Sequence, residues 1–219
     1  MTNHTDQFFV DSAQRTISME ADAVSALSST LGPPFAAACR HILITTGRVV
    51  VTGMGKSGHI AGKIAATLAS TGTPAFFVHP GEASHGDMGM ITASDCVIAL
   101  SNSGSTHEIL TLLPIIKRLG IPLISMTGSD TSELAQAADV HLLASVETEA
   151  CPLNLAPTSS TTAALVMGDA LEIAILEPPG FTAEEFAFSH PGGALGKRLL
   201  LRVADVMVSG LSLIHISEP

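Results

Sequence analysis

Aromatic residues are scarce in this sequence of 219 residues. It has no Trp and no Tyr, and aromatics make up 4% of the chain while hydrophobic residues make up 46%. The core must therefore be built from Ala, Val, Ile, Leu and Met. Such small side chains favour helices packed closely on a parallel sheet. The length suits one α/β domain.

Basic residues are also few. Lys and Arg number 10 against 20 Asp and Glu, which gives a formal net charge of −10. This charge opposes a nucleic acid backbone and an anionic membrane surface, so neither is an expected partner. A small anionic ligand is compatible with it, because amides, hydroxyls and one Lys can bind phosphate locally whatever the overall charge.

Cysteines are sparse, and targeting signals are missing from the pattern. Cys39, Cys96 and Cys151 form no CxxC or Cys/His metal spacing, which fits a reduced cytosolic setting. The N-terminus lacks the basic start and apolar core of a signal peptide. No apolar run reaches the roughly 18 residues of a membrane-spanning helix. We therefore expect a cytoplasmic protein with no membrane span.

Short apolar runs alternate with helical patterns along the chain. The runs that read as strands are 48–52, 75–78, 96–100, 122–126 and 140–143, and the helical patterns cover 8–31, a second stretch ending near 44, 108–119, 133–138 and 159–176. This order predicts a flavodoxin-like, three-layer α/β/α sandwich with a five-stranded parallel sheet. Ligands of such sheets bind beyond the carboxyl ends of the strands, where the turns after the first and third strands can face each other.

The first of these turns reads Gly53-Met54-Gly55-Lys56-Ser57-Gly58. Glycines let the backbone approach an anion, the start of a helix offers free amides, and Lys56 adds a positive charge. The spacing is neither a complete P-loop nor the GxGxxG fingerprint. A tight turn that needs the glycines for structural reasons alone is the alternative.

The turn after the third predicted strand is rich in hydroxyl groups. Its polar members are Ser101, Ser103, Ser105 and Thr106, and Glu108 follows two residues later. With the amides of a helix start, these hydroxyls predict a phosphate site. Ordinary capping by one Ser is the alternative, but a single cap does not need four hydroxyls.

Three other segments place His or Glu beside turn residues: 79–87 with His79 and His85, 147–152 with Glu149, and 189–193 with His190. Loops at strand ends are where a rigid scaffold displays catalytic groups. Each of these side chains alone has an ordinary structural interpretation. Their joint occurrence indicates a functional site.

Together these segments resemble the arabinose 5-phosphate isomerases of the sugar isomerase (SIS) domain superfamily. The resemblance extends from about Ala36 to Met207, through GMGKSGHIAGKIAATLASTGTPAFFVHPGEASHGDMGM, SNSGSTHE, ETEACPLNLAPTSSTTAALVMGDALE and FSHPGGALGKRLL. It implies an aldose-ketose isomerase that interconverts D-arabinose 5-phosphate and D-ribulose 5-phosphate through an enediol(ate). It also implies a supply of 3-deoxy-D-manno-octulosonate (Kdo) for lipopolysaccharide biosynthesis, although relatives in capsule or sugar-alcohol pathways carry out the same reaction.

The resemblance also implies roles for individual residues. The positions that match catalytically relevant ones are Lys56, Glu108, Glu149 and His190, and those associated with substrate are Gly72, Thr73, His79 and His85. His79 further matches a position that binds an inhibitory zinc, and no cofactor is required. Members are usually homotetramers in which His190 reaches the active site of a neighbouring subunit.

The reaction needs a ring-opening acid or base, a base that moves a proton between the first two sugar carbons, and a stabiliser of negative charge. Our hypothesis assigns ring opening or oxygen protonation to His190 or His85 and carbon proton transfer to Glu149 or Glu108. Lys56 would stabilise charge on substrate oxygens, and the hydroxyl-rich turn would bind phosphate. The sequence leaves the choice between the glutamates open.

The resemblance also implies the domain boundaries. Residues 1–207 are interpreted as one SIS domain, with N-terminal helices over 1–46. Members usually continue into two CBS modules, and 202–207 resembles the start of the first; residues 208–219 continue no earlier pattern and are interpreted as a non-native or truncated tail.

Two other functions are compatible with the fold. One is a non-catalytic phosphosugar sensor, which the missing basic helix-turn-helix segment and the His/Glu set argue against. The other is an SIS isomerase of a different sugar phosphate. We expect residues 79–87 to distinguish sugar phosphates by their length.

Overall fold

The computed structural model describes residues 5–177, 180–190, 198–199 and 207. Five parallel strands form one sheet in the order β2-β1-β3-β4-β5. Their bounds are β1 Val49–Gly53, β2 Ala75–Val78, β3 Cys96–Leu100, β4 Leu123–Thr127 and β5 Val140–Leu143. In register, Val49 of β1 pairs with Ala75 on one side and with Cys96 on the other. The chain leaves β1 for β2 and returns past β1 to β3, so the turns after β1 and β3 adjoin.

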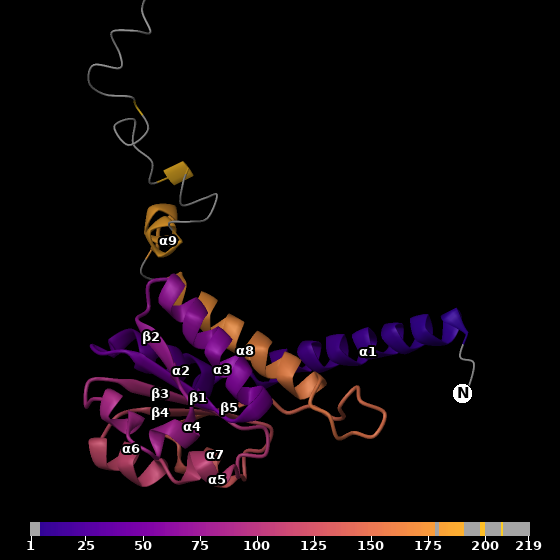
Figure 1. Ribbon diagram of the computed structural model, residues 1–219, viewed down its shortest axis with the longest axis horizontal. Coiled ribbons are helices and arrows are strands. Elements are labelled where there is room, and N and C mark those ends of the chain that lie inside the picture. Colours follow the sequence, from indigo (N-terminus) through magenta and orange to yellow (C-terminus); the bar gives the residue numbers. More distant parts are fainter. Residues whose placement is uncertain (1–4, 178–179, 191–197, 200–206, 208–219) are drawn as a thin grey trace, which may run out of the picture.

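Helices cover both faces of the sheet (Figure 1). One face carries α1 (Asp6–Ala26), the 3-10 helix η1 (Leu27–Thr30), α2 (Pro33–Ile44), α3 (Gly55–Ser70) and α8 (Ser159–Leu176), and the other carries α4 (Pro80–Ala83), η2 (Asp87–Met90), α5 (His107–Leu110), α6 (Leu113–Leu119) and α7 (Glu133–Ala137). Successive residues of β1 point to opposite faces, so Val49 and Val51 join one core and Val50 the other. The predicted three-layer sandwich is confirmed.

The prediction of one helix over 108–119 was wrong. The segment forms two short helices, α5 and α6, and Pro114 lies in the first turn of α6. Proline has no amide hydrogen and clashes with the carbonyl four residues earlier in a helix interior, whereas the first turn tolerates it. The helix therefore restarts just before Pro114.

Helix α8 tests a second expectation, that the chain has no membrane span. By length and composition it is apolar enough to cross a membrane, although the sequence was expected to hold no such run. In the fold it packs against α1, α2 and α3. Its residues Met167, Leu171 and Ile175 are part of the core on that face of the sheet. α8 is thus a core helix of the sandwich.

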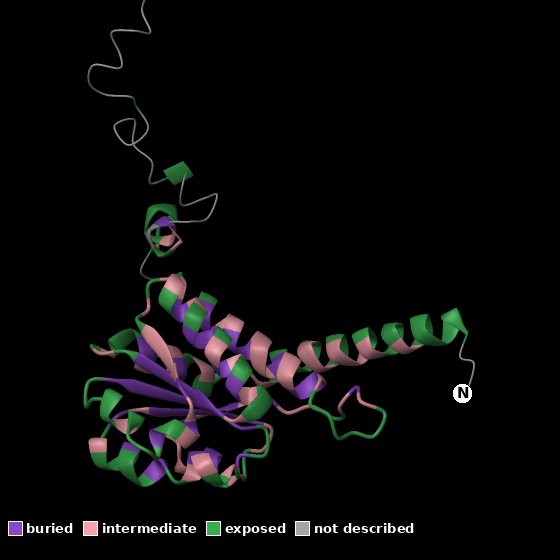
Figure 2. Cartoon of the chain, viewed as in Figure 1, coloured by how far each residue is buried: buried purple, intermediate pink, exposed green. Residues whose placement is uncertain are grey.

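Helix α1 extends beyond the rest of the fold, with its N-terminal half largely exposed (Figure 2). The predicted helix is present, but the apolar residues Val10 and Ile17 are 49% and 68% exposed. Leu27, just after its end, is buried in the core. No residue of α1 itself is buried within the chain.

Candidate active site

The turn between β1 and α3 is built by its glycines. Gly55 has a φ of 58°, in the left-handed region that favours glycine. A Cβ on Gly58 would lie 2.6 Å from the carbonyl oxygen of Gly53, so glycine lets α3 approach the strand closely. These two glycines thus have the structural role that the alternative interpretation named. Lys56, in the first turn of α3, is exposed, and no salt bridge to its ammonium group is found among the described residues.

Residues 101–106, which we call the serine loop, follow β3. Ser101 is buried; its Oγ lies 2.7 Å from the Thr106 Oγ1 and accepts a hydrogen bond from the Gly104 amide at 3.0 Å. Ser103 and Ser105 are exposed, and the Ser105 hydroxyl donates to the Ser103 Oγ at 3.2 Å. Ser101 therefore shapes the loop, while Ser103 and Ser105 provide its accessible hydroxyls.

Glu149 is held at the N-terminus of α8. Its Oε2 accepts hydrogen bonds from the Thr158 amide at 2.7 Å, the Thr158 hydroxyl at 3.1 Å and the Ser160 amide at 3.2 Å. Partial burial raises the pKa of Glu149, but the bonds from Ser160 and Thr158 outweigh it, so the net pKa is lowered. The carboxylate is ionised at neutral pH. These three bonds all go to Oε2 and none of them to Oε1.

Glu108 follows a different strand from Glu149. It sits in α5, two residues after the serine loop, and is half-buried. The two candidate carboxylates therefore come from different strand ends, one after β3 and one after β5.

A cavity of about 170 Å³ lies beside the Lys56 turn, on the β2 side. Gly55, Gly58, His59, Phe77 and His79 line it. The His79 Nδ1 accepts a hydrogen bond from the Gly81 amide at 3.2 Å and caps α4. His59 was not singled out from the sequence; its signal was its position one helical turn after Lys56.

His85 is exposed and follows α4, in the segment that leads to η2. It shares the 79–87 segment with His79 at the carboxyl end of β2. One chain therefore gathers Lys56, the serine loop, both glutamates, His79 and His85 at the carboxyl edge of the sheet.

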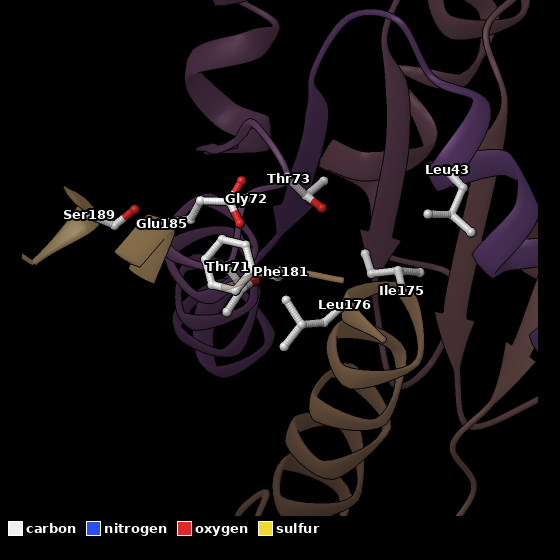
Figure 3. Close-up of a pocket in the computed structure, with 9 residues that line it drawn as sticks. All are labelled: Leu43, Thr71, Gly72, Thr73, Ile175, Leu176, Phe181, Glu185 and Ser189. Carbon is white, nitrogen blue, oxygen red and sulfur yellow. The ribbon is translucent and has the colours of Figure 1, made fainter. Parts of the chain in front are cut away.

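Gly72 and Thr73 lie at the opposite edge, because they precede β2. They line a cavity of about 450 Å³ together with Ile175 and Leu176 at the end of α8. Figure 3 shows Phe181 in the middle of this group and Glu185 and Ser189 of α9 (Ala183–Ser189) at its side.

His190 follows α9 and is thus adjacent to that cavity. Its ring stacks on Phe186 with centroids 4.2 Å apart, and its Nδ1 lies 3.1 Å from the Phe186 carbonyl oxygen. A single chain does not bring Gly72, Thr73 and His190 together with the residues at the carboxyl edge. The following Pro191–Gly193, most of 202–207 and the tail 208–219 lie outside the described residues.

His79 is the residue at which a bound zinc was expected. Among the described residues there is no group of three or more His, Cys, Asp or Glu arranged to hold a metal ion. The ring nitrogen Nδ1 of His79 already accepts the Gly81 amide. The zinc expectation remains a prediction.

The SIS domain family matches residues 42–174, a segment that contains all five strands and the helices α3 to α7. The chain belongs to the SIS domain family.

Curated relatives match this chain over most of its length. The chain is 71% identical over 202 residues to "Arabinose 5-phosphate isomerase KdsD" of Pseudomonas aeruginosa, covering 92% of this chain and 62% of the relative. It is 57% identical to the protein of the same name from Escherichia coli O157:H7, covering 96% of this chain and 64% of the relative. The chain thus spans less than two thirds of the length of these relatives.

A solved structure has the same fold. The protein c3406 of E. coli CFT073, in complex with arabinose 5-phosphate, superposes with a TM-score of 0.82 at 43% identity and covers 86% of this chain and 100% of that one.

Proposed function

We propose that this chain is the catalytic domain of an arabinose 5-phosphate isomerase, which interconverts D-arabinose 5-phosphate and D-ribulose 5-phosphate. The observation that carries the proposal is the 71% identity, over 92% of the chain, to a relative named for this reaction. The structural likeness to a protein in complex with arabinose 5-phosphate supports a sugar phosphate as ligand. The side chains at the carboxyl edge supply the chemical groups that an aldose-ketose isomerisation needs.

The phosphate group binds at the serine loop in this proposal. Ser103 and Ser105 have exposed hydroxyls, and the loop is kept in shape by the bonds of Ser101 to Thr106 and Gly104. Lys56 lies on the neighbouring turn, because β1 and β3 are adjacent. Its ammonium group would offset negative charge on the substrate oxygens as the enediolate forms.

Glu149 is our choice between the two candidate bases. Its Oε2 is fixed by three hydrogen bonds, so the carboxylate is preorganised and ionised, and its Oε1 is left to take the proton. The lowered pKa makes it a weaker base. Exclusion of water when substrate covers the site would raise that pKa towards the range of an effective base.

His85 and His190 are the candidates for ring opening. His85 belongs to the carboxyl edge of the same chain, whereas His190 lies near the opposite edge. We therefore propose a homotetramer in which the edge that carries Gly72, Thr73 and His190 completes the site of a neighbouring copy. The separation of these residues from Lys56 within one chain supports this arrangement.

An arabinose 5-phosphate isomerase of this kind would act in the cytoplasm and supply Kdo and lipopolysaccharide biosynthesis, as the KdsD name of the relatives suggests. It would need no cofactor, and zinc bound through His79 would inhibit it. Chelator treatment should therefore leave activity intact or increase it.

The test is turnover of arabinose 5-phosphate by the purified chain after chelator treatment, with ribose, glucose and sedoheptulose phosphates for comparison. We expect selective turnover of arabinose 5-phosphate. Glu149→Gln and Glu108→Gln should each lower kcat, by about 100-fold or more for the carbon base. Glu133→Gln, an exposed carboxyl in the first turn of α7, is the control.

Three outcomes separate the alternatives. Turnover of a different sugar phosphate would identify another SIS isomerase. Binding without turnover by the assembled protein would favour a phosphosugar sensor. Near-normal kcat in both Gln variants would reject a carboxylate as the carbon base.

A further inference from the structure

His59 faces the same cavity as His79 but comes from a different element. His79 caps α4 after β2, whereas His59 lies in α3, one turn after Lys56. Phe77 forms the apolar part of the wall, with its ring centroid 6.4 Å from that of His79. Two imidazoles thus border a small cavity next to the one cationic side chain of the β1–α3 turn.

The hydrogen bonds of the two rings differ. Because His79 Nδ1 accepts the Gly81 amide, a neutral His79 carries its proton on Nε2 and can only donate from there. No hydrogen bond to the His59 ring is found in the described part of the chain, so this ring can both accept and donate. An OH or C=O group between them would meet a donor from His79 and a donor or acceptor from His59.

The position of the cavity relates it to one end of a sugar phosphate. β2 and β3 flank β1, and neighbouring strands lie about 4.8 Å apart, so the ends of β2 and β3 are roughly 10 Å from each other. The serine loop follows β3 and His79 follows β2. A substrate whose phosphate lies at the serine loop would cross the Lys56 turn and place its other end at the cavity.

We infer that His59 is a further substrate-contacting residue, which binds the oxygens at the carbonyl end of the sugar together with His79. The inference rests on the proposed function. It assigns the serine loop to the phosphate and the His59–His79 cavity to the first two carbons of the sugar. The separation between the serine loop and His59 thereby sets the length of the sugar phosphate that the site accepts.

The test compares His59→Ala and His59→Gln with the parent chain. We expect His59→Ala to lower kcat/KM for arabinose 5-phosphate about tenfold or more, the effect of losing one or two hydrogen bonds to substrate. Gln places an amide near the former Nε2 and should restore part of this loss. Inhibition by inorganic phosphate, which probes the serine loop alone, should stay within about twofold of the parent.

A control for the helix is Ala66→Gln, at an exposed position of α3 away from the cavity. It should keep the parent kcat/KM, and all variants should show the parent's unfolding midpoint within a few degrees. A His59→Ala variant with a parental kcat/KM would overturn the inference. So would a parallel weakening of inorganic phosphate inhibition, since that would indicate a general disturbance of the turn.

Failure of the proposed function gives a different result. If the parent chain turns over no arabinose 5-phosphate, the isomerase proposal fails but the inference about His59 does not fail with it. The role of His59 is then tested by calorimetric binding instead of turnover. His59 then keeps its role if His59→Ala weakens arabinose 5-phosphate binding but not inorganic phosphate binding. Equal binding of the sugar phosphate by both proteins overturns it.

Discussion

Glu172 is a buried carboxyl group between α3 and α8, outside the candidate site. It is 1% exposed, its Oε2 lies 3.3 Å from the Lys63 Nζ, and Lys63 also pairs with Asp169. Burial raises the pKa of Glu172 to about 7, and the attraction of Lys63 only partly opposes the increase. Its Oε1 has no hydrogen-bond partner in the part of the chain that the structure describes.

This raised pKa predicts a pH-dependent stability. The unfolded chain loses the Glu172 proton near the ordinary pKa of 4.5, whereas the folded protein keeps it up to about pH 7. The folded state binds more protons in this window, so the contribution of Glu172 to the free energy of unfolding falls as pH rises from about 4.5 to about 7. We expect a loss of about 3 kcal/mol across the window.

Urea unfolding of the parent and of Glu172→Gln at pH 5, 6, 7 and 8 measures this loss. The variant cannot titrate at this position, so the stability difference between the two proteins should shift in its favour with rising pH. Glu133→Gln, which alters an exposed carboxyl, should follow the parent. Parallel curves for the parent and Glu172→Gln would contradict the raised pKa.

At the scale of elements, α3 and α8 meet at a glycine. A Cβ on Gly168 would lie 2.5 Å from the Cδ1 of Ile64, which is itself fully buried. The two helices begin at the Lys56 turn and beside Glu149, so their packing sets the relative position of these two groups.

Gly168→Ala should therefore destabilise the protein by about 1–2 kcal/mol, because overpacking of a dense core forces a shift of Ile64 or of a helix. The double variant with Ile64→Val, which removes Cδ1, should recover part of the loss. Gly62→Ala is a matched control in α3, since a Cβ there meets nothing within 4 Å, and it should stabilise the helix by about 0.5–1 kcal/mol. Denaturant midpoints of the four proteins test this; equal midpoints for Gly168→Ala and the parent would refute it.

At the scale of the whole molecule, the candidate site is divided between two edges of the sheet. Lys56 and Glu149 lie at the carboxyl edge, and His190 follows α9 near the amino edge. If one copy completes the site of another, two variants that are each inactive should complement each other. A 1:1 mixture of Lys56→Ala and His190→Ala, unfolded and refolded together, would contain about a quarter of its sites with both residues intact.

Activity of the mixture at about a quarter of the parent level is the expected result. Lys56→Ala mixed with Glu149→Gln is the control, because both residues belong to the same chain's edge and no intact site can form. An inactive Lys56→Ala and His190→Ala mixture would show that His190 does not act across copies.

Much of the fold follows from local patterns. The five strands are short apolar runs that the parallel sheet buries, and α8 begins at Ser159 and ends at Leu176, as the hydroxyl residues and the following prolines predict. Pro114 was the local signal for the break in the helix that was predicted over 108–119. The meeting of the Lys56 turn and the serine loop was also predictable, because parallel strands in this order bring both turns to one edge.

What the sequence determined by itself was the order of the elements and the types of side chain at their ends, since periodicity, glycines and prolines act over a few residues. Only the tertiary structure decided the environments of those side chains. Thr158 and Ser160 lower the pKa of Glu149, while burial against α3 raises that of Glu172. His59 reaches the cavity of His79 because α3 packs beside β2. Such environments depend on contacts between distant segments, and packing creates those contacts.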